Sequence, residues 1–167
     1  MFDRKTWYQR IGFQEQWFED QLEKIGLPKC AGAFTGTCDA AIADWLTQRL
    51  ERHQPDPQFL YWMTLNSHLP VPMSSALPAE GSCSISPTLG QYPSLCSWYH
   101  LVFNVHDSVA RMAMSEVARP TVFVVVGDHA PPFATPALRS QFSDAVVPYI
   151  LLIPLCCDRA RAELPSS

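Results

Sequence analysis

Residues Thr121 to Phe133, TVFVVVGDHAPPF, carry the most informative pattern for predicting the fold. Its first six residues carry no charge and five of them are valine or phenylalanine, so apolar and polar side chains do not alternate. This pattern is typical of a strand buried on both faces, as at the centre of a parallel sheet. Gly127 then allows a sharp turn, and Asp128 and His129 follow at the carboxyl end of the strand, where open α/β sheets carry their chemistry.

Asp128 and His129 are candidate ligands of one metal ion. A carboxylate and an imidazole are both ligands that zinc accepts. In the alternative interpretation, Asp128 caps a turn and His129 forms a hydrogen bond at the rim of the sheet. The tandem prolines Pro131 and Pro132 lack backbone donors, so the chain is expected to leave this turn as an extended loop.

A second buried strand is predicted at Gln58–Asn66, which is apolar and aromatic throughout. His68 follows this strand as Asp128 and His129 follow the first, in a loop stiffened by Pro70. We therefore expect the two strand tips to face a common pocket. A third strand, Val146–Ile153, contains Pro148 and is expected near the edge of the sheet.

Helical spacing of apolar residues predicts helices that cover the sheet. The segments are Phe2–Ile11 with a stop at Gly12, Asp39–Arg52, Ser94–Ala118 and a short Pro136–Phe142. Together the elements predict an α/β domain over residues 1–157, with a mostly parallel sheet flanked by helices. Residues 158–167 are expected to form a polar tail, and Pro72–Pro93 a long surface loop. Three strands would leave broad apolar faces uncovered, so a further part of the domain is expected to complete the sheet.

Six cysteines are many for a domain of this size. Cys30 and Cys38 flank one flexible loop, and Cys83 and Cys96 flank another, so each pair is either a disulfide or two free thiols. Disulfides would fit an oxidising compartment such as the periplasm. No CxxC motif is present, so a structural zinc site built on thiolates is not expected. His100 and His106 are interpreted as structural or exposed, because residues six apart do not share a helix face.

Composition excludes some classes of function. A net charge of -4 with scattered basic residues argues against nucleic-acid binding. The longest apolar stretch is interrupted by Pro148 and Pro154 and falls short of the ~20 residues that a membrane-spanning helix needs.

Three segments resemble the sulfatase-like branch of the alkaline phosphatase superfamily. This branch includes lipoteichoic acid synthases, phosphoglycerol transferases and phosphoethanolamine transferases. Residues 127–132, GDHAPP, resemble its metal motif. Residues 64–70, TLNSHLP, resemble its T-x-x-S-H-x-P segment, and residues 3–13, DRKTWYQRIGF, resemble a segment that follows the half of the domain bearing the nucleophile.

The resemblance implies a partial alkaline-phosphatase-like sandwich that forms the carboxyl-terminal half of a catalytic domain. Asp128 and His129 would then hold a divalent metal, zinc as the first expectation and manganese as the second. His68 would act as the catalytic and substrate-binding residue by contacting the transferred phosphoryl or sulfuryl group. The remaining ligand and a threonine nucleophile are expected in the missing amino-terminal half, while Thr35 and Thr37 are interpreted as structural.

The implied function is a metal-dependent phosphotransferase at the periplasmic face of the bacterial inner membrane. It would move phosphoglycerol or phosphoethanolamine from a donor to a lipid or glycan acceptor through a covalent phospho-enzyme. The paired-cysteine loops resemble those of phosphoethanolamine transferases. Contact with the membrane is expected only through an amino-terminal anchor outside this chain. Sulfate ester hydrolysis is the alternative chemistry, and a non-catalytic fragment or pseudo-enzyme is the alternative class.

Overall fold

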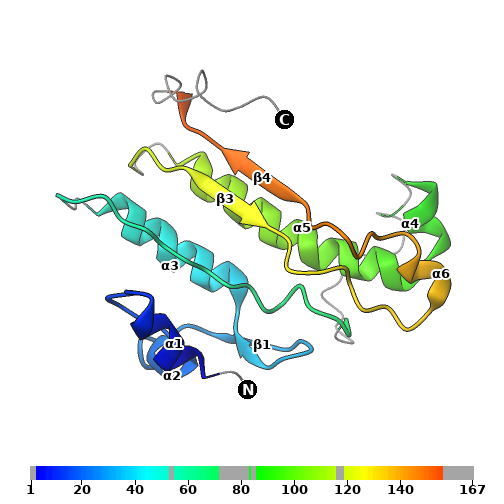
Figure 1. Cartoon of the computed structure of the whole chain (residues 1–167), viewed down its shortest axis with the longest axis horizontal. Coiled ribbons are helices and arrows are strands. Elements are labelled where there is room, and N and C mark those ends of the chain that lie inside the picture. The colour runs from blue at the N-terminus through cyan, green and yellow to red at the C-terminus, as the bar shows by residue number, and fades with distance from the viewer. Residues whose placement is uncertain (1–2, 53–54, 72–82, 84–85, 116–118, 156–167) are drawn as a thin grey trace.

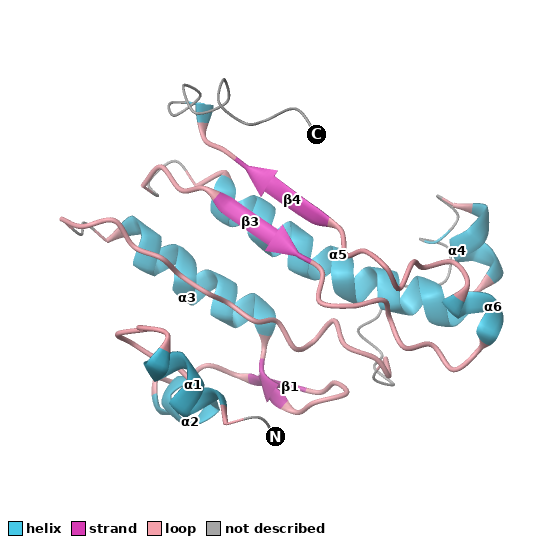
Figure 2. Ribbon diagram, in the orientation of Figure 1, coloured by secondary structure: helices cyan, strands magenta, loops and turns pink. Residues whose placement is uncertain are grey.

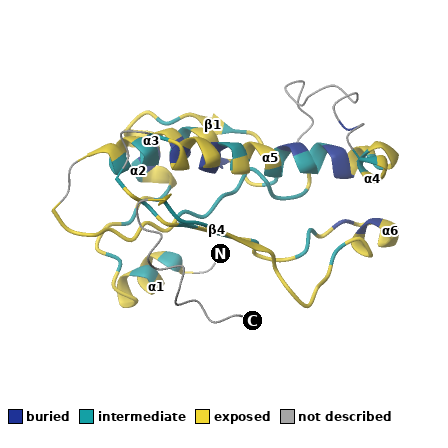
Figure 3. Cartoon of the chain, turned by 90° about the horizontal axis from the view of Figure 1, so that it is seen from above, coloured by how far each residue is buried: buried dark blue, intermediate teal, exposed yellow. Residues whose placement is uncertain are grey.

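Two long helices and a small sheet form the centre of the molecule. The computed structural model describes residues 3–52, 55–71, 83, 86–115 and 119–155 (Figure 1). Helices α3 (Asp39–Glu51) and α5 (Pro93–Ala113) run side by side, and strands β3 (Phe123–Val126) and β4 (Tyr149–Leu152) pack against them. Viewed from above, β4 lies in a layer below α3 and α5 (Figure 3). The arrangement has one helical layer and one sheet layer.

Smaller elements surround this centre (Figure 2). They are α1 (Arg4–Arg10), α2 (Glu19–Lys24), β1 (Lys29–Cys30), β2 (Gly36–Thr37), α4 (Pro87–Gln91) and α6 (Pro136–Arg139). Strands β1 and β2 pair antiparallel and form a hairpin beside the start of α3. In Figure 1, α4 and α6 lie together near the amino-terminal end of α5.

Local signals in the sequence explain where the helices begin and end. Helix α5 begins at Pro93, whose fixed φ suits the first turn. Backbone N–H groups in the first turn have no acceptor within the helix, so the N–H that proline lacks is not needed there. Helix α1 is followed by Gly12 at φ +98, a left-handed conformation that glycine adopts without strain. The predicted helices at Phe2–Ile11, Asp39–Arg52, Ser94–Ala118 and Pro136–Phe142 are confirmed, each within a few residues, as α1, α3, α5 and α6.

One core cluster joins the helical layer to the sheet. Ala43 on α3 packs with Val109 and Met112 on α5, and side chains from β3 and β4 cover them. Those covering residues are Phe123, Val125 and Leu152. A second cluster, Leu95, Phe133 and Leu138, lies at the other end of α5 with Trp98 and Phe142 against it. The second cluster matters for the site because it anchors the loop that follows β3.

The prediction of a central parallel strand at Thr121–Val126 is wrong. In the part of the chain that the structure describes, β3 pairs only with β4, antiparallel, with Val124 opposite Leu151. Its burial alternates: Phe123 and Val125 are half-buried against the helices, while Val124 and Val126 are exposed. A run of valines has no alternation of polarity, so the sequence pattern hides that one face is uncovered.

The predicted strand at Gln58–Asn66 is also wrong, because this segment is extended but pairs with no strand among the described residues. Phe59 is 78% exposed, and only Trp62 packs against the core cluster of α3 and α5. The backbone amides of Leu65 and Asn66 bond to a side chain of α3 instead of to a neighbouring strand. The third predicted strand, Val146–Ile153, is confirmed in shortened form as β4.

Other predictions differ in smaller ways. Within Pro72–Pro93, residues 87–91 form α4 and not a loop, and residues 72–82 and 84–85 lie outside the described part. The polar tail at 158–167 and the cysteines 156 and 157 also lie outside it. No helix in the described ranges is both long and apolar enough to cross a bilayer. The observed sheets are two short antiparallel pairs, so the predicted parallel sheet is absent from the described residues.

Candidate functional site

The structure brings His68 and His129 together, although they are far apart in the sequence. The centroids of their rings are 6.0 Å apart, and the rings meet nearly edge to face. Next to them, the Asp128 carboxylate Oδ2 lies 3.7 Å from His129 Nε2. Two loops therefore present one carboxylate and two imidazoles in one place, as expected for the tips of the two predicted strands.

Trp98 on α5 connects the two loops. Its indole Nε1 donates a hydrogen bond to the backbone carbonyl of Ser67, at 3.0 Å, directly before His68. Its ring also packs edge-on against Phe133, with the centroids 5.9 Å apart. Phe133 is 6% exposed and ends the loop that carries His129. A single side chain of the helical layer thus fixes both histidine loops relative to each other.

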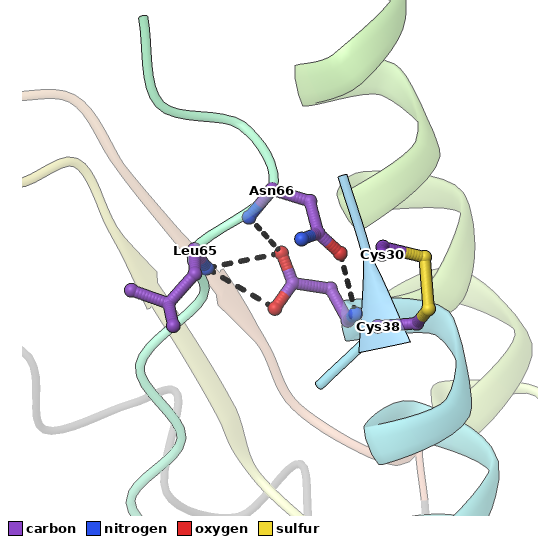
Figure 4. The surroundings of a disulfide bond; sticks show 5 residues. Cys30, Cys38, Leu65 and Asn66 are labelled. Atoms are coloured by element: carbon purple, nitrogen blue, oxygen red, sulfur yellow. Dashed lines mark hydrogen bonds between the residues drawn. A yellow bond between two sulfur atoms is a disulfide. The ribbon is translucent and has the colours of Figure 1, made fainter. Parts of the chain in front are cut away.

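Asp39, the first residue of α3, holds the segment before His68 (Figure 4). Its carboxylate accepts hydrogen bonds from the backbone amide of Leu65 at 3.1 Å and from that of Asn66 at 2.7 Å. In return, the Asn66 side-chain oxygen accepts from the Asp39 backbone amide at 2.7 Å. From the sequence, Asp39 is predicted only as the first residue of a helix. Its role in holding residues 65 and 66 was missed because no local pattern links positions so far apart.

Burial raises the pKa of the Asp39 carboxyl above its ordinary value of 3.8. Hydrogen bonds from the amides of Asn66 and Leu65 act in the opposite direction but do not outweigh the burial. The side chain is 4% exposed. Burying an ionised carboxylate in this position costs free energy. Removing the side chain would nevertheless leave two amide donors without their acceptor.

The β1–β2 hairpin adds a second support for His68. A disulfide joins Cys30 and Cys38 at its base, with Cα atoms 4.8 Å apart, and Cys38 directly precedes Asp39. At the tip of the hairpin, the ring of Phe34 lies edge-on to the His68 ring, with centroids 4.8 Å apart. The hairpin thus contacts His68 directly and also tethers the start of α3.

Hydrogen bonds fix which nitrogen of each histidine faces the site. His129 Nδ1 lies 2.8 Å from the carbonyl oxygen of Ala130, and His68 Nδ1 contacts the carbonyl oxygen of Leu69. A carbonyl oxygen only accepts, so each Nδ1 carries the proton that it donates. The remaining nitrogen of neutral His129, Nε2, then has a lone pair, which is the arrangement that metal-binding histidines show.

The donor pair Asp128 and His129 fits one metal ion. Ligand-to-zinc distances are about 2.0–2.2 Å for carboxylate oxygen and imidazole nitrogen, so two ligands of one zinc lie roughly 3–4 Å apart. The 3.7 Å between Oδ2 and Nε2 falls in this range. Both side chains are well exposed, at 96% and 52%, so they can take up an ion without rearrangement of the core. Among the described residues, no third cysteine, histidine or acidic side chain joins them in a group of three.

The remaining candidates fall elsewhere. Cys83 and Cys96 form the second disulfide, and buried His100 lies beside it. His106 is exposed on α5. Thr37 is buried in β2, and Thr35 is exposed in the turn before it, so both lie within the loop that the Cys30–Cys38 disulfide closes. A groove of about 560 Å³ lined by Trp17, Trp45 and Arg52, among others, contains none of the site residues.

Comparison with known proteins supports a family assignment. The family model described as Sulfatase matches residues 1–154, a range that includes Asp39, His68, Asp128 and His129. No curated protein and no solved structure matches the chain. A domain of this family indicates a sulfatase-like hydrolase or transferase activity, and enzymes of the family are generally metal-dependent. The chain therefore belongs to the sulfatase family, within the alkaline phosphatase superfamily.

Proposed function

We propose that this chain forms part of a metal-dependent phosphotransferase site. The reaction is transfer of a phosphoglycerol or phosphoethanolamine group from a lipid- or glycan-linked donor to a lipid or glycan acceptor. The observation that carries the proposal is that His68 lies next to His129, whose neighbour Asp128 adds a carboxylate. The two loops that bring these side chains together are far apart in the sequence. Membership of the sulfatase family supports the general class of reaction.

Each residue of the site has a separate role in this proposal. Asp128 Oδ2 and His129 Nε2 are the metal ligands, and zinc is the first choice with manganese the second. A bound divalent ion would neutralise charge on phosphoryl oxygens and favour ionisation of a hydroxyl nucleophile. His68 donates from Nε2 to an oxygen of the transferred group. Its Nδ1 contacts the carbonyl oxygen of Leu69, so Nε2 is the ring nitrogen left to contact that group.

The other half of the site is proposed to come from a further part of the domain. A catalytic zinc takes three protein ligands, and at Asp128 and His129 the described residues supply two. The face of β3 and β4 that points away from the helices is apolar and exposed, including Val124, Val126 and Tyr149. A missing amino-terminal half of the domain would cover that face and supply a third ligand and the threonine nucleophile of a covalent phospho-enzyme. The same proposal places the site at the periplasmic face of the inner membrane, in agreement with the two disulfides.

Manganese titration of the oxidised chain, followed by NMR, tests the metal site. Mn²⁺ prefers oxygen and nitrogen ligands and broadens the signals of nearby protons, and oxidised cysteines do not compete for it. We expect the ring signals of His129 and then His68 to broaden before those of exposed His106. Asp128→Ala should abolish the early broadening of both rings, and His129→Ala should abolish that of His68. In the control His106→Ala, the His129 and His68 signals should broaden at the same manganese concentration as in the wild type. Equal broadening of all three histidines would refute the site.

A second titration identifies the class of transferred group. With zinc, which does not broaden signals, in place of manganese, O-phosphoethanolamine and glycerol phosphate should shift the His68 ring signals at lower concentration than inorganic sulfate does. A preference for sulfate would support the sulfate ester hydrolase instead. The isolated chain is expected to show no phosphodiesterase turnover, because the nucleophile is proposed to lie elsewhere. Turnover that survives His68→Asn and Asp128→Ala would contradict the proposal.

A further inference from the structure

A second cluster of possible metal ligands lies on α5, formed by residues outside the histidine loops. The sulfur atoms of Cys83 and Cys96 and a ring nitrogen of His100 all lie within 4.8 Å of one another. All three residues are buried, with 2%, 7% and 9% of their surface exposed. The sequence did not suggest this cluster, because it contains no CxxC motif and because Cys83 precedes α5 by many residues.

Helix geometry explains how two of the three ligands come together. Cys96 and His100 are four residues apart on α5, so their side chains lie one above the other on the same face. Two ligands at this spacing on a helix can bind one metal ion, as paired histidines do in H-E-x-x-H metal sites. Cys83 closes the arrangement from outside the helix, with its Sγ 3.4 Å from His100 Nε2.

In the described state the two cysteines form a disulfide, with Cα atoms 5.9 Å apart. The sulfur atoms of a disulfide cannot ionise, and the thiolate is the form that binds metals. Reduction would leave two thiols facing an imidazole in a buried place. The same three atoms can therefore hold the segment at Cys83 to α5 in two ways, by a covalent bond or through an ion.

We propose that Cys83, Cys96 and His100 form a redox-gated site for a thiophilic divalent cation, with zinc as the preferred ion. The site opens when the Cys83–Cys96 disulfide is reduced and closes when it forms. Two thiolates and one imidazole are the donor set that selects zinc over calcium, magnesium and manganese. Three protein ligands leave the fourth tetrahedral position to water or an external ligand.

The gating step balances as a thiol–disulfide exchange followed by ion binding. A dithiol reductant transfers two electrons and two protons to the Cys83–Cys96 disulfide, which becomes two thiols while the reductant becomes a disulfide. Zinc then displaces the two thiol protons to solvent and binds two thiolates and His100 Nε2. A disulfide oxidant reverses the sequence: it takes two electrons from the two thiolates and two protons from solvent and becomes a dithiol, while the Cys83–Cys96 disulfide re-forms and the ion is released.

Protection of cysteines from alkylation tests the proposal on the whole chain. The chain is reduced with a phosphine, incubated with or without zinc and treated with iodoacetamide, and each cysteine is then quantified by peptide mass spectrometry. We expect zinc to slow alkylation of Cys83 and Cys96 strongly, with little effect on Cys30 and Cys38. The Cys30–Cys38 pair is a matched internal control, because it belongs to no three-ligand group among the described residues.

Variants and a spectroscopic probe complete the test. His100→Ala should weaken zinc binding by at least about tenfold, while His106→Ala on the same helix should not. Cobalt bound to the reduced chain should give the thiolate-to-cobalt absorption band, and the oxidised chain should give none. Equal protection of all cysteines would overturn the proposal, including the case in which reduction unfolds the chain and exposes every thiol. Unchanged zinc binding in His100→Ala would also overturn it.

Discussion

Asp39 and Asn66 bond to each other in both directions. The Asp39 carboxylate accepts from the Asn66 backbone amide, and the Asn66 side-chain oxygen accepts from the Asp39 backbone amide, both at 2.7 Å. The pair connects the start of α3 with the segment that leads to His68 (Figure 4). This reciprocal contact replaces the strand pairing that the sequence predicted for Gln58–Asn66.

Replacing Asp39 by alanine should loosen the segment before His68. The backbone amides of Leu65 and Asn66 would lose their acceptor, so we expect the free energy of unfolding to fall by about 1–3 kcal/mol. Hydrogen exchange at these two amides should accelerate more than at the amides of β3. Asp44→Ala is the control, since Asp44 lies on the same helix but is exposed. Equal effects of the two variants would show that the hydrogen bonds from the Asp39 carboxylate to residues 65 and 66 do not contribute to stability.

The pH dependence of stability should carry the signature of buried Asp39. Its folded-state pKa is raised by burial above 3.8, so the folded chain holds the proton more tightly than the unfolded chain. The contribution of this group to stability therefore increases as pH falls through the folded-state pKa, and levels off below 3.8. The stability difference between the wild-type chain and Asp39→Asn should shift in favour of the wild type on acidification. Urea unfolding between neutral pH and pH ~4 measures it.

A shift in the opposite direction would contradict the burial argument. It would mean that the hydrogen bonds from the amides of Leu65 and Asn66 stabilise the ionised carboxylate more than burial destabilises it.

The Cys30–Cys38 disulfide should stabilise the same region from the other side. It closes a loop with a sequence separation of 8, for which chain entropy predicts a contribution of about 2–3 kcal/mol. The variant Cys30→Ser/Cys38→Ser should lose that amount and should show faster exchange at Asn66, because Cys38 directly precedes Asp39. Loss of stability without faster exchange at Asn66 would show that the disulfide does not help to hold the segment before His68.

Sequence predicted the helices and the meeting of the two histidine loops better than it predicted the sheet. Helix α5 follows from apolar spacing and Pro93, which are local signals. The positions of His68 and His129 follow from each loop coming after an apolar run, whether or not that run pairs as a strand. Pairing itself depends on which segments are present to pair, and a run of valines such as Val124–Val126 does not encode it.

Residues that act across long separations were the ones missed. Asp39 meets Asn66, Trp98 meets Ser67 and Cys83 meets His100, and each contact is set by tertiary packing and not by a local motif. Cys83 and Cys96 are predicted from the sequence as a candidate disulfide only because they flank a flexible loop. Nothing in the sequence indicates that His100 lies beside them.

Removing the indole hydrogen bond of Trp98 should disturb the site more than the fold. Trp98→Phe keeps a ring against Phe133 but loses the bond to the Ser67 carbonyl, so we expect a loss of about 0.5–1.5 kcal/mol. Nuclear Overhauser contacts between the rings of His68 and His129 should weaken in this variant. Trp7→Phe is the control, because Trp7 is 57% exposed on α1. Unchanged ring contacts in Trp98→Phe would show that Phe34 and Asp39 position His68 without Trp98.

Two neighbouring valines of β3 should differ strongly in how much the same substitution destabilises the chain. Val125 packs against the cluster of Ala43, Val109 and Met112, so Val125→Lys should destabilise the chain by about 2 kcal/mol or more. Val124 is 62% exposed on the other face, so Val124→Lys should change stability by less than about 0.5 kcal/mol. Sedimentation should also show less self-association of Val124→Lys than of the wild-type chain, since a lysine at residue 124 interrupts an apolar exposed face.

The Val124 variant also tests the proposed missing half of the domain. If that half covers the outer face of β3 and β4, then Val124→Lys is neutral in this chain alone but destabilises a longer chain that contains the whole catalytic domain. Urea unfolding of both chains, with and without the substitution, measures the difference. An equally small effect in the longer chain would mean that the face stays open to solvent, and the third metal ligand would then have to reach Asp128 and His129 by another route.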